Sequence, residues 1–438
     1  MKVKNKGSRE SFQPVCLLLQ NINKEKSLEN GRDKKMGVNW FQEIFYPPQK
    51  REIFHIERKL LRVVNVWPGD NLINFKFLSV YILGFFFISI PSCAYILTTP
   101  DKFVDIAVSI CEVIQMTVYL LKMANILVFR HELKDLMDTL QHNFTALSKK
   151  SPKLLAFYEK ILRRSHLIIV TYVLLVPAAL VAYFYFPITF DFVKYLMGRT
   201  DLQYPFVLKA NYLIIDPRQD TVTFVIYTIL SRMYMNIFQY GFYSMELFIV
   251  TLFFYVSSYM ESVKVQLRHL SEEEDELSEA ELTLRLKEII DDHATAINMV
   301  KSLDIVKRNM LIAQFVLFTF SFCFVLFNLT YVTQDAMFFV SCFVVTIVTQ
   351  LEQFVLSFYA GKIQAESYAV GFEAYNLKWY NRSAKFQKLI IDIVLCSQDK
   401  TITLTAGKFY PVDLQIFGEA LQKSLGYFTM IKTVYGKV

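Results

Sequence analysis

The stretch MLIAQFVLFTFSFCFVLFNLTYVT, residues 310–333, decides the fold class of this chain. It contains no Asp, Glu, Lys or Arg, and it exceeds the roughly 20 helical residues that cross a hydrocarbon layer of about 30 Å. We therefore predict that it forms a transmembrane helix.

Six further stretches are also long and apolar enough to cross, although most of them contain a few charged residues, and they lie near 72–97, 103–128, 167–190, 222–257, 336–360 and 411–434. The composition of the 438-residue chain agrees, because 54% hydrophobic and 16% aromatic residues with only 20% charged residues do not fit a soluble protein. The sequence predicts an all-α membrane protein with seven transmembrane helices in residues 37–438. Residues 1–36 are basic and polar, and we expect them to form a disordered extension.

Orientation follows from the distribution of Lys and Arg between the two sides of the predicted membrane. The segments on one side hold 36 of these residues and those on the other side hold 7. Cytoplasmic loops carry the basic excess in membrane proteins. We therefore predict a cytoplasmic amino terminus and an extracellular carboxyl terminus, which is the reverse of a G-protein-coupled receptor. The net charge of +7 then requires no nucleic acid as partner.

The sequence offers no candidate for catalysis, a metal site or a cofactor. The six cysteines include no CxxC pair, and the six histidines lie near no GxSxG, HExxH or P-loop pattern. The nearest cluster, Asp291-Asp292-His293, is interpreted as a solvated helix surface. We predict that the protein is not an enzyme.

Two connections between the predicted crossings stand out. The outer loop 191–221 is long enough to act as a lid. On the inner side, residues 271–292 begin with a Ser-x-x-Glu capping pattern at Ser271 and continue with good helix formers. We expect the fourth and fifth crossings to extend into the cytoplasm as helices, either solvated or packed against another subunit.

The last apolar stretch, 411–434, carries the clearest functional signal. Pro411 suits a first helical turn, and one face of the helix that follows is apolar throughout. The other face is polar at its start and apolar near the outer surface; in chain order it presents Glu419, Lys423, Tyr427, Met430 and Val434. Charges within a membrane face a bundle interior or a water-filled cavity. The stripe therefore lines a water path or seals an internal ion pair, and a pore would need several copies of the helix around an axis.

At this point the residues resemble a known family. The segment 403–411 (TLTAGKFYP) and the helix ending 424–432 (SLGYFTMIK) resemble the carboxyl-terminal signature of insect odorant receptors, with Cys396-Ser-Gln398 a few residues ahead. Trp67-Pro68, before the first crossing, is similar as well. The resemblance covers residues 37–438, including the seven crossings and the reversed topology.

This resemblance implies an odorant-gated, non-selective cation channel, in which the chain is the ligand-binding subunit and forms a heterotetramer with an obligate co-receptor. It implies a multi-pass protein in the plasma membrane, on the dendrite of an olfactory sensory neuron. The last helix would line the pore, with Met430 and Val434 as its gate and Glu419, Lys423 and Tyr427 along its wall. The helix from about 366 to 396 would belong to a cytoplasmic anchor.

Three alternatives remain open. The related gustatory receptors carry a different signature where this chain has Gly426-Tyr427 and Thr433-Val434. A transporter would show two matching halves with broken helices, and none is visible. A G-protein-coupled receptor would have the opposite orientation. The co-receptor itself would carry a longer insertion between the fourth and fifth crossings and a Gln near position 433, so a tuning subunit fits better.

The resemblance also implies a pocket for a small, apolar volatile ligand among crossings two, three, four and six. The candidate residues are Val108, Cys111, Glu112, Gln115, Val176, Ala179, Tyr183, Tyr227, Ile229, Phe339, Phe343 and Thr346. Glu112 stands out because an isolated carboxylate in an apolar span is costly. A structural hydrogen bond, for example to Gln115, is the alternative interpretation.

Overall fold

The computed structural model describes residues 52–70, 82, 89–98, 103–181, 185, 197, 221–331 and 336–435. These residues belong to one unit, Glu52–Val438. The predicted extension 1–36, much of the first crossing and most of the predicted lid lie outside the described residues.

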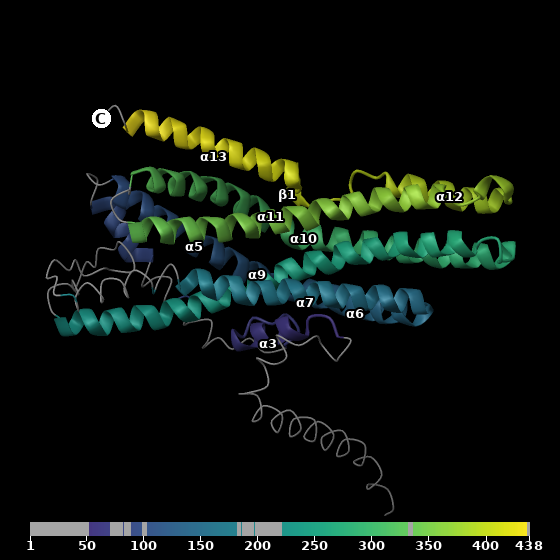
Figure 1. The fold of residues 1–438 in the computed structure, drawn as a ribbon, viewed down its shortest axis with the longest axis horizontal. Coiled ribbons are helices and arrows are strands. Elements are labelled where there is room, and N and C mark those ends of the chain that lie inside the picture. Colours follow the sequence, from purple (N-terminus) through teal and green to yellow (C-terminus); the bar gives the residue numbers. More distant parts are fainter. Residues whose placement is uncertain are drawn as a thin grey trace, which may run out of the picture. The chain divides into compact units, whose positions relative to one another are not determined.

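Helices make up almost all of the described chain (Figure 1). In chain order the elements are α3 (His55–Val63), α5 (Phe103–Val128), α6 (Arg130–Lys150), α7 (Pro152–Leu180), α9 (Thr221–Glu273), α10 (Glu279–Tyr331), α11 (Ala336–Tyr375), η3 (Trp379–Asn381), α12 (Ala384–Ser397), β1 (Thr405–Ala406), β2 (Tyr410–Pro411) and α13 (Leu414–Tyr435). Residues 89–98 are also helical. Helix α5 has the bounds predicted for the second crossing.

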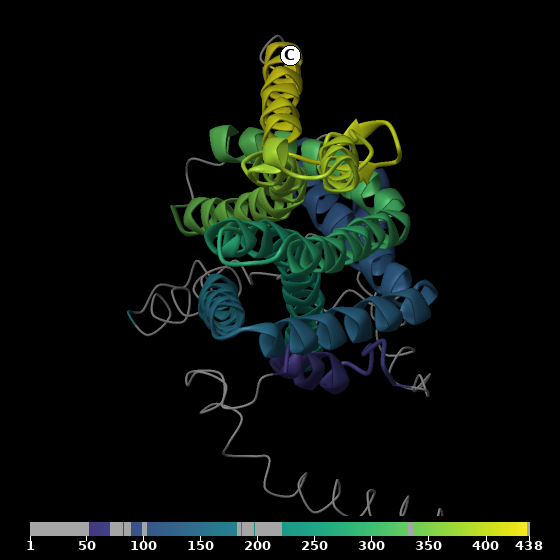
Figure 2. The ribbon, with the colours of Figure 1, turned by 90° about the vertical axis from the view of Figure 1, so that its right-hand side faces the viewer.

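Helices α9 and α10 form the centre of the packing. Each is 53 residues long, which corresponds to about 80 Å at 1.5 Å per residue, far more than a membrane needs. Helix α9 packs on α11, α10 and α7, and α10 packs on α5 and α13. Figure 2 shows α6 and α7 (blue) on one side of this teal pair and α12 and α13 (yellow) on the other.

Three described stretches are long and apolar enough to cross a membrane: Ser109–Val128, Asn236–Glu273 and Glu279–Thr330. They contain most of the second and fifth predicted crossings and the second half of the fourth. The apolar run 310–333 is thus the outer part of a much longer helix, and α10 continues from it toward the predicted cytoplasmic side.

The turn between α9 and α10 lies later than predicted. Helix α9 continues through Ser271 to Glu273, because Leu267 and Leu270 are buried in its packed face. The capping box forms at Ser278, whose hydroxyl accepts from the Glu281 N–H at 3.3 Å while the Glu281 carboxylate accepts from the Ser278 N–H at 3.1 Å. The Ser-x-x-Glu pattern at Ser271 therefore does not cap a helix, and the prediction of a cap there is wrong.

The predicted anchor helix 366–396 is broken in two, which corrects that expectation. Its first part is the end of α11, and its second part is α12, which folds back against α11 after a turn (Figure 1). Folding back buries Phe386 and Ile390. At Gly371 a Cβ would lie 2.0 Å from Ser397 Oγ, so glycine permits the close approach of the two helices.

The start of the last helix also differs from the prediction. Pro411 belongs to β2, which pairs with β1 in a small hairpin, and α13 begins at Leu414 with the Asp413 carboxylate accepting from the Ile416 N–H at 2.8 Å. Gly407 sits in the hairpin at φ +64, a conformation that glycine adopts without strain. Its N–H donates to the Arg308 carbonyl at 2.9 Å, which fastens the hairpin to α10.

Candidate functional site

Helix α13 is held against α10 and α11 by a narrow stripe of small and aromatic side chains. Ala420 and Ser424 are buried, and the Ser424 hydroxyl donates to the Thr319 carbonyl of α10 at 3.0 Å. Phe417 packs on Phe318 and Phe354, with ring centroids 6.2 and 6.0 Å apart. Small residues let two helix backbones approach closely in a membrane. The contact with α10 therefore fixes which face of α13 points outward.

The outward face of α13 contains both predicted gate residues. Met430 is 67% exposed and Val434 is 61% exposed. At Gly418 and Gly426 nothing lies within 4 Å of where a Cβ would be. A large apolar side chain exposed on a helix end marks a surface that other chains or lipid can cover. In this single chain the predicted gate residues are thus largely exposed.

The predicted pore-lining residues precede the gate residues along α13. Glu419, Lys423 and Tyr427 line an open groove of about 230 Å³ between α13 and α10. The Tyr427 ring stacks on Phe320, with centroids 5.9 Å apart. The remaining lining residues are mostly apolar: Ile312, Phe315, Val316, Thr319, Phe320, Ala406, Tyr410, Ile416 and Ala420. The groove therefore includes the predicted wall residues and does not reach Met430 and Val434.

The second interpretation of this stripe was an internal ion pair between Glu419 and Lys423. This pair does not form in the described part of the chain. Lys423 is exposed, and Glu419 instead accepts a hydrogen bond from Gln415 Nε2 at 3.3 Å. The water path along this stripe stays a prediction.

The predicted ligand pocket is described only in part. The side chains of Val108, Glu112, Val176, Ala179, Tyr183, Tyr227 and Phe339 lie outside the described residues. Among the others, Thr346 is buried, Gln115 is half-buried, and Ile229 and Phe343 are exposed. Cys111 is buried with its Sγ 3.7 Å from the Ser321 carbonyl of α10, a helix outside the four predicted to form the pocket. The pocket stays a prediction.

A buried cluster of charges was missed by the sequence analysis. Lys122 of α5 forms ion pairs with Glu246 of α9 and with Glu352 of α11, the second at 2.7 Å. Gln314 of α10 donates from Nε2 to Glu352 at 3.2 Å, and the Lys122 ammonium lies 4.8 Å from the Phe242 ring centroid. Each of the three charged residues lies inside a predicted crossing, where a charge is costly, so the argument applied to Glu112 also identifies them in the sequence.

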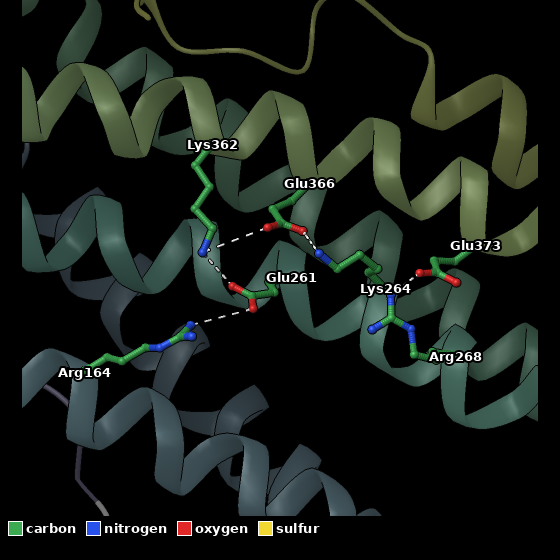
Figure 3. Close-up of polar contacts among 7 residues, drawn as sticks. All are labelled: Arg164, Glu261, Lys264, Arg268, Lys362, Glu366 and Glu373. Atoms are coloured by element: carbon green, nitrogen blue, oxygen red, sulfur yellow. Dashed lines mark hydrogen bonds and ion pairs between the residues drawn. The ribbon is translucent and has the colours of Figure 1, made fainter. Parts of the chain in front are cut away.

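A second set of charges connects α7, α9 and α11 in the predicted cytoplasmic part (Figure 3). Glu261 of α9 pairs with Arg164 of α7 at 3.8 Å and with Lys362 of α11 at 2.6 Å. Further along the same two helices, Lys264 and Arg268 of α9 pair with Glu366 and Glu373 of α11. These partly exposed pairs fix the register of α9 against α11.

The cluster Asp291-Asp292-His293 is only in part the solvated surface that the sequence predicted, because Asp291 alone is exposed. His293 is buried, and Asp292 accepts from Lys150 at 2.6 Å and from Gln266 at 2.9 Å. It therefore joins α6, α9 and α10. The described residues contain no group of His, Cys, Asp and Glu side chains that could hold a metal ion.

Comparison with known proteins gives a consistent picture. The family model described as "7tm Odorant receptor" matches residues 102–424. Similar relatives include Odorant receptor 10 of Aedes albopictus, 27% identical over 153 residues, and Odorant receptor Or2 of Anopheles gambiae, 27% identical over 155 residues. Each alignment covers 35% of this chain and 40% of the relative, so the match spans about two fifths of these relatives' length.

Similar solved structures include the insect olfactory receptor OR5 from Machilis hrabei, one of them in complex with eugenol. The eugenol complex aligns with a TM-score of 0.71 at 15% identity, over 86% of this chain and 97% of that chain. At that identity the likeness concerns the fold.

Proposed function

The chain belongs to the odorant receptor family, and from this premise we propose that it is the ligand-binding subunit of an odorant-gated, non-selective cation channel. The family match over residues 102–424 carries the proposal. The chain has the all-α, seven-transmembrane fold of the insect olfactory receptor.

The exposed face of α13 supports a pore between several copies. One helix cannot enclose a water path, and closed rings of subunits present the same face to a common axis. In such a ring Met430 and Val434 would form an apolar constriction, which gates by excluding water. Glu419, Lys423 and Tyr427 would lie deeper along the path, beside the groove.

The partners follow from the same proposal. The chain would assemble with an odorant co-receptor subunit as a heterotetramer in the plasma membrane of an olfactory sensory neuron, with its amino terminus in the cytoplasm. Its ligand would be a small apolar volatile molecule, held by the pocket residues predicted above. Because one similar structure contains eugenol, an aromatic compound of this kind is a reasonable first probe.

The test is co-expression with a co-receptor in oocytes, with cation current recorded during application of volatile compounds that include eugenol. We expect a ligand-evoked, non-selective current that cells with the co-receptor alone do not show. If a panel of volatiles evokes no current from chains that reach the surface, the ligand-binding role is wrong. A carboxyl-terminal epitope reached by antibody on intact cells, with an amino-terminal one protected, would support the orientation; the opposite result would contradict it.

A further inference from the structure

The buried cluster of Lys122, Glu246 and Glu352 has a charge imbalance that the proposed channel function does not explain. Its members come from α5, α9 and α11, and Glu246 and Lys122 are 0% and 1% exposed. Both carboxyl groups contact the same ammonium nitrogen. The two carboxyl groups also lie within hydrogen-bonding reach of each other. Two carboxylates and one ammonium leave one negative charge in a dry interior, which is costly.

A second lysine nearby does not supply the missing positive charge by contact. Lys307 of α10 is completely buried, and its Nζ donates to Asn125 Oδ1 at 2.8 Å. Glu246 is within electrostatic range of it, but Lys307 forms no ion pair in the described part of the chain. A fully buried lysine without a carboxylate beside it favours the neutral amine.

The other groups that face the cluster are uncharged at neutral pH. Gln314 of α10 and Gln353 of α11 are amides, and they bond to each other at 3.0 Å. Tyr172 of α7 and Tyr243 of α9 lie within electrostatic range of both carboxyl groups, and phenols are neutral at this pH. None of these side chains can neutralise a second carboxylate. When two carboxyl groups share one site, holding a proton on one of them relieves the repulsion.

We propose that Glu246 and Glu352 hold one proton between them, so that the cluster is a proton-binding site that joins α5, α9 and α11. With the proton bound, the ammonium of Lys122 bridges one carboxylate and one carboxylic acid, and the cluster is neutral. Loss of the proton at alkaline pH leaves two carboxylates on a single ammonium. The three helices then separate more readily, so protonation stabilises this part of the bundle.

The test uses thermal unfolding of the purified full chain in detergent, which does not depend on odorant response. A glutamine has the size of a protonated glutamate and no charge. We expect Glu246→Gln and Glu352→Gln each to unfold within about 3 °C of the wild type at pH 8. The double variant leaves the ammonium without a counter-charge, and we expect it and Lys122→Gln to unfold about 10 °C lower. Exposed Lys160→Gln is the matched control.

The pH profile gives a second measurement that does not need the Lys122 variant to fold. Between pH 7 and pH 9.5 the wild type should lose stability more steeply than either single glutamine variant. If both single variants unfold about 10 °C lower, both carboxylates are charged and the proposal is wrong. In that case, a lower unfolding midpoint of the wild type when choline replaces Na⁺ and K⁺ would identify a bound cation. An unfolding midpoint about 10 °C lower in Lys307→Met would instead identify that lysine as the counter-charge.

Discussion

Glu57 offers the most quantitative test of the packing. It lies on α3, before the first predicted crossing, where its side chain is 1% exposed, and hydrogen bonds to the Thr251 side chain and to the backbone only partly offset the effect of burial on its carboxyl. Burial raises the pKa of this carboxyl from 4.5 to about 7. The perturbation is Glu57→Gln, which replaces the carboxyl by a neutral group of the same size.

The magnitude follows from the pKa. The difference between 4.5 and about 7, at about 1.36 kcal/mol per pH unit, corresponds to about 3 kcal/mol of unfolding free energy. The fold favours the protonated acid, so Glu57 imposes no cost below pH 4.5. The cost grows as pH rises from 4.5 toward 7 and is complete above about 7. The glutamine variant should therefore be more stable than the wild type at pH 8 and equally stable at pH 4.5.

The assay is thermal unfolding of purified protein in detergent at the two pH values. We expect Glu57→Gln to raise the unfolding midpoint by about 5 °C or more at pH 8 and to leave it unchanged at pH 4.5. Glu132→Gln, at an exposed position of α6, is the control and should change neither midpoint. A shift of equal size at both pH values, or a lower midpoint at pH 8, would refute the reasoning.

The remaining predictions concern α13 and the ion pairs of α9. Ser424→Leu should force α13 away from α10 at a cost of about 1–3 kcal/mol and alter channel opening, whereas Ser424→Ala should cost much less; equal effects in unfolding and current measurements would argue against the contact. Met430→Ser and Val434→Ser should each raise the resting current of the co-expressed channel, and an unchanged leak with an unchanged ligand response would remove them as the gate. Lys264→Glu should lower thermal stability and the added Glu366→Lys should restore it, with a coupling of about 0.5–3 kcal/mol; no recovery in the double variant would mean that the pair does not hold α9 to α11.

Local patterns in the sequence predicted several elements well. Helix α5 has the expected bounds, and residues 310–331 of the apolar stretch lie in α10, which ends at Tyr331. The polar-to-apolar order along the last helix is present on α13, with Met430 and Val434 exposed. Each of these features depends on residues within a few turns of one another, which periodicity can report.

The sequence predictions were wrong where contacts between residues far apart in the chain determined which local structure formed. The capping box formed at Ser278 and not at Ser271, because packing carried α9 onward. The helix expected over 366–396 broke because α12 gains an apolar face against α11 when it folds back. Pro411 entered a hairpin fastened to α10, and no local signal indicated that.

The sequence by itself determined that this chain is a helical membrane protein, because apolar length and the uneven placement of Lys and Arg express how each segment partitions between water and lipid. Only the tertiary structure decided which charges meet. Lys122 and Glu352 are 230 residues apart, yet the rotation and register of their helices place them 2.7 Å apart beside Glu246. Rotation and register depend on the packing of all neighbouring helices at once, and no single segment contains that information.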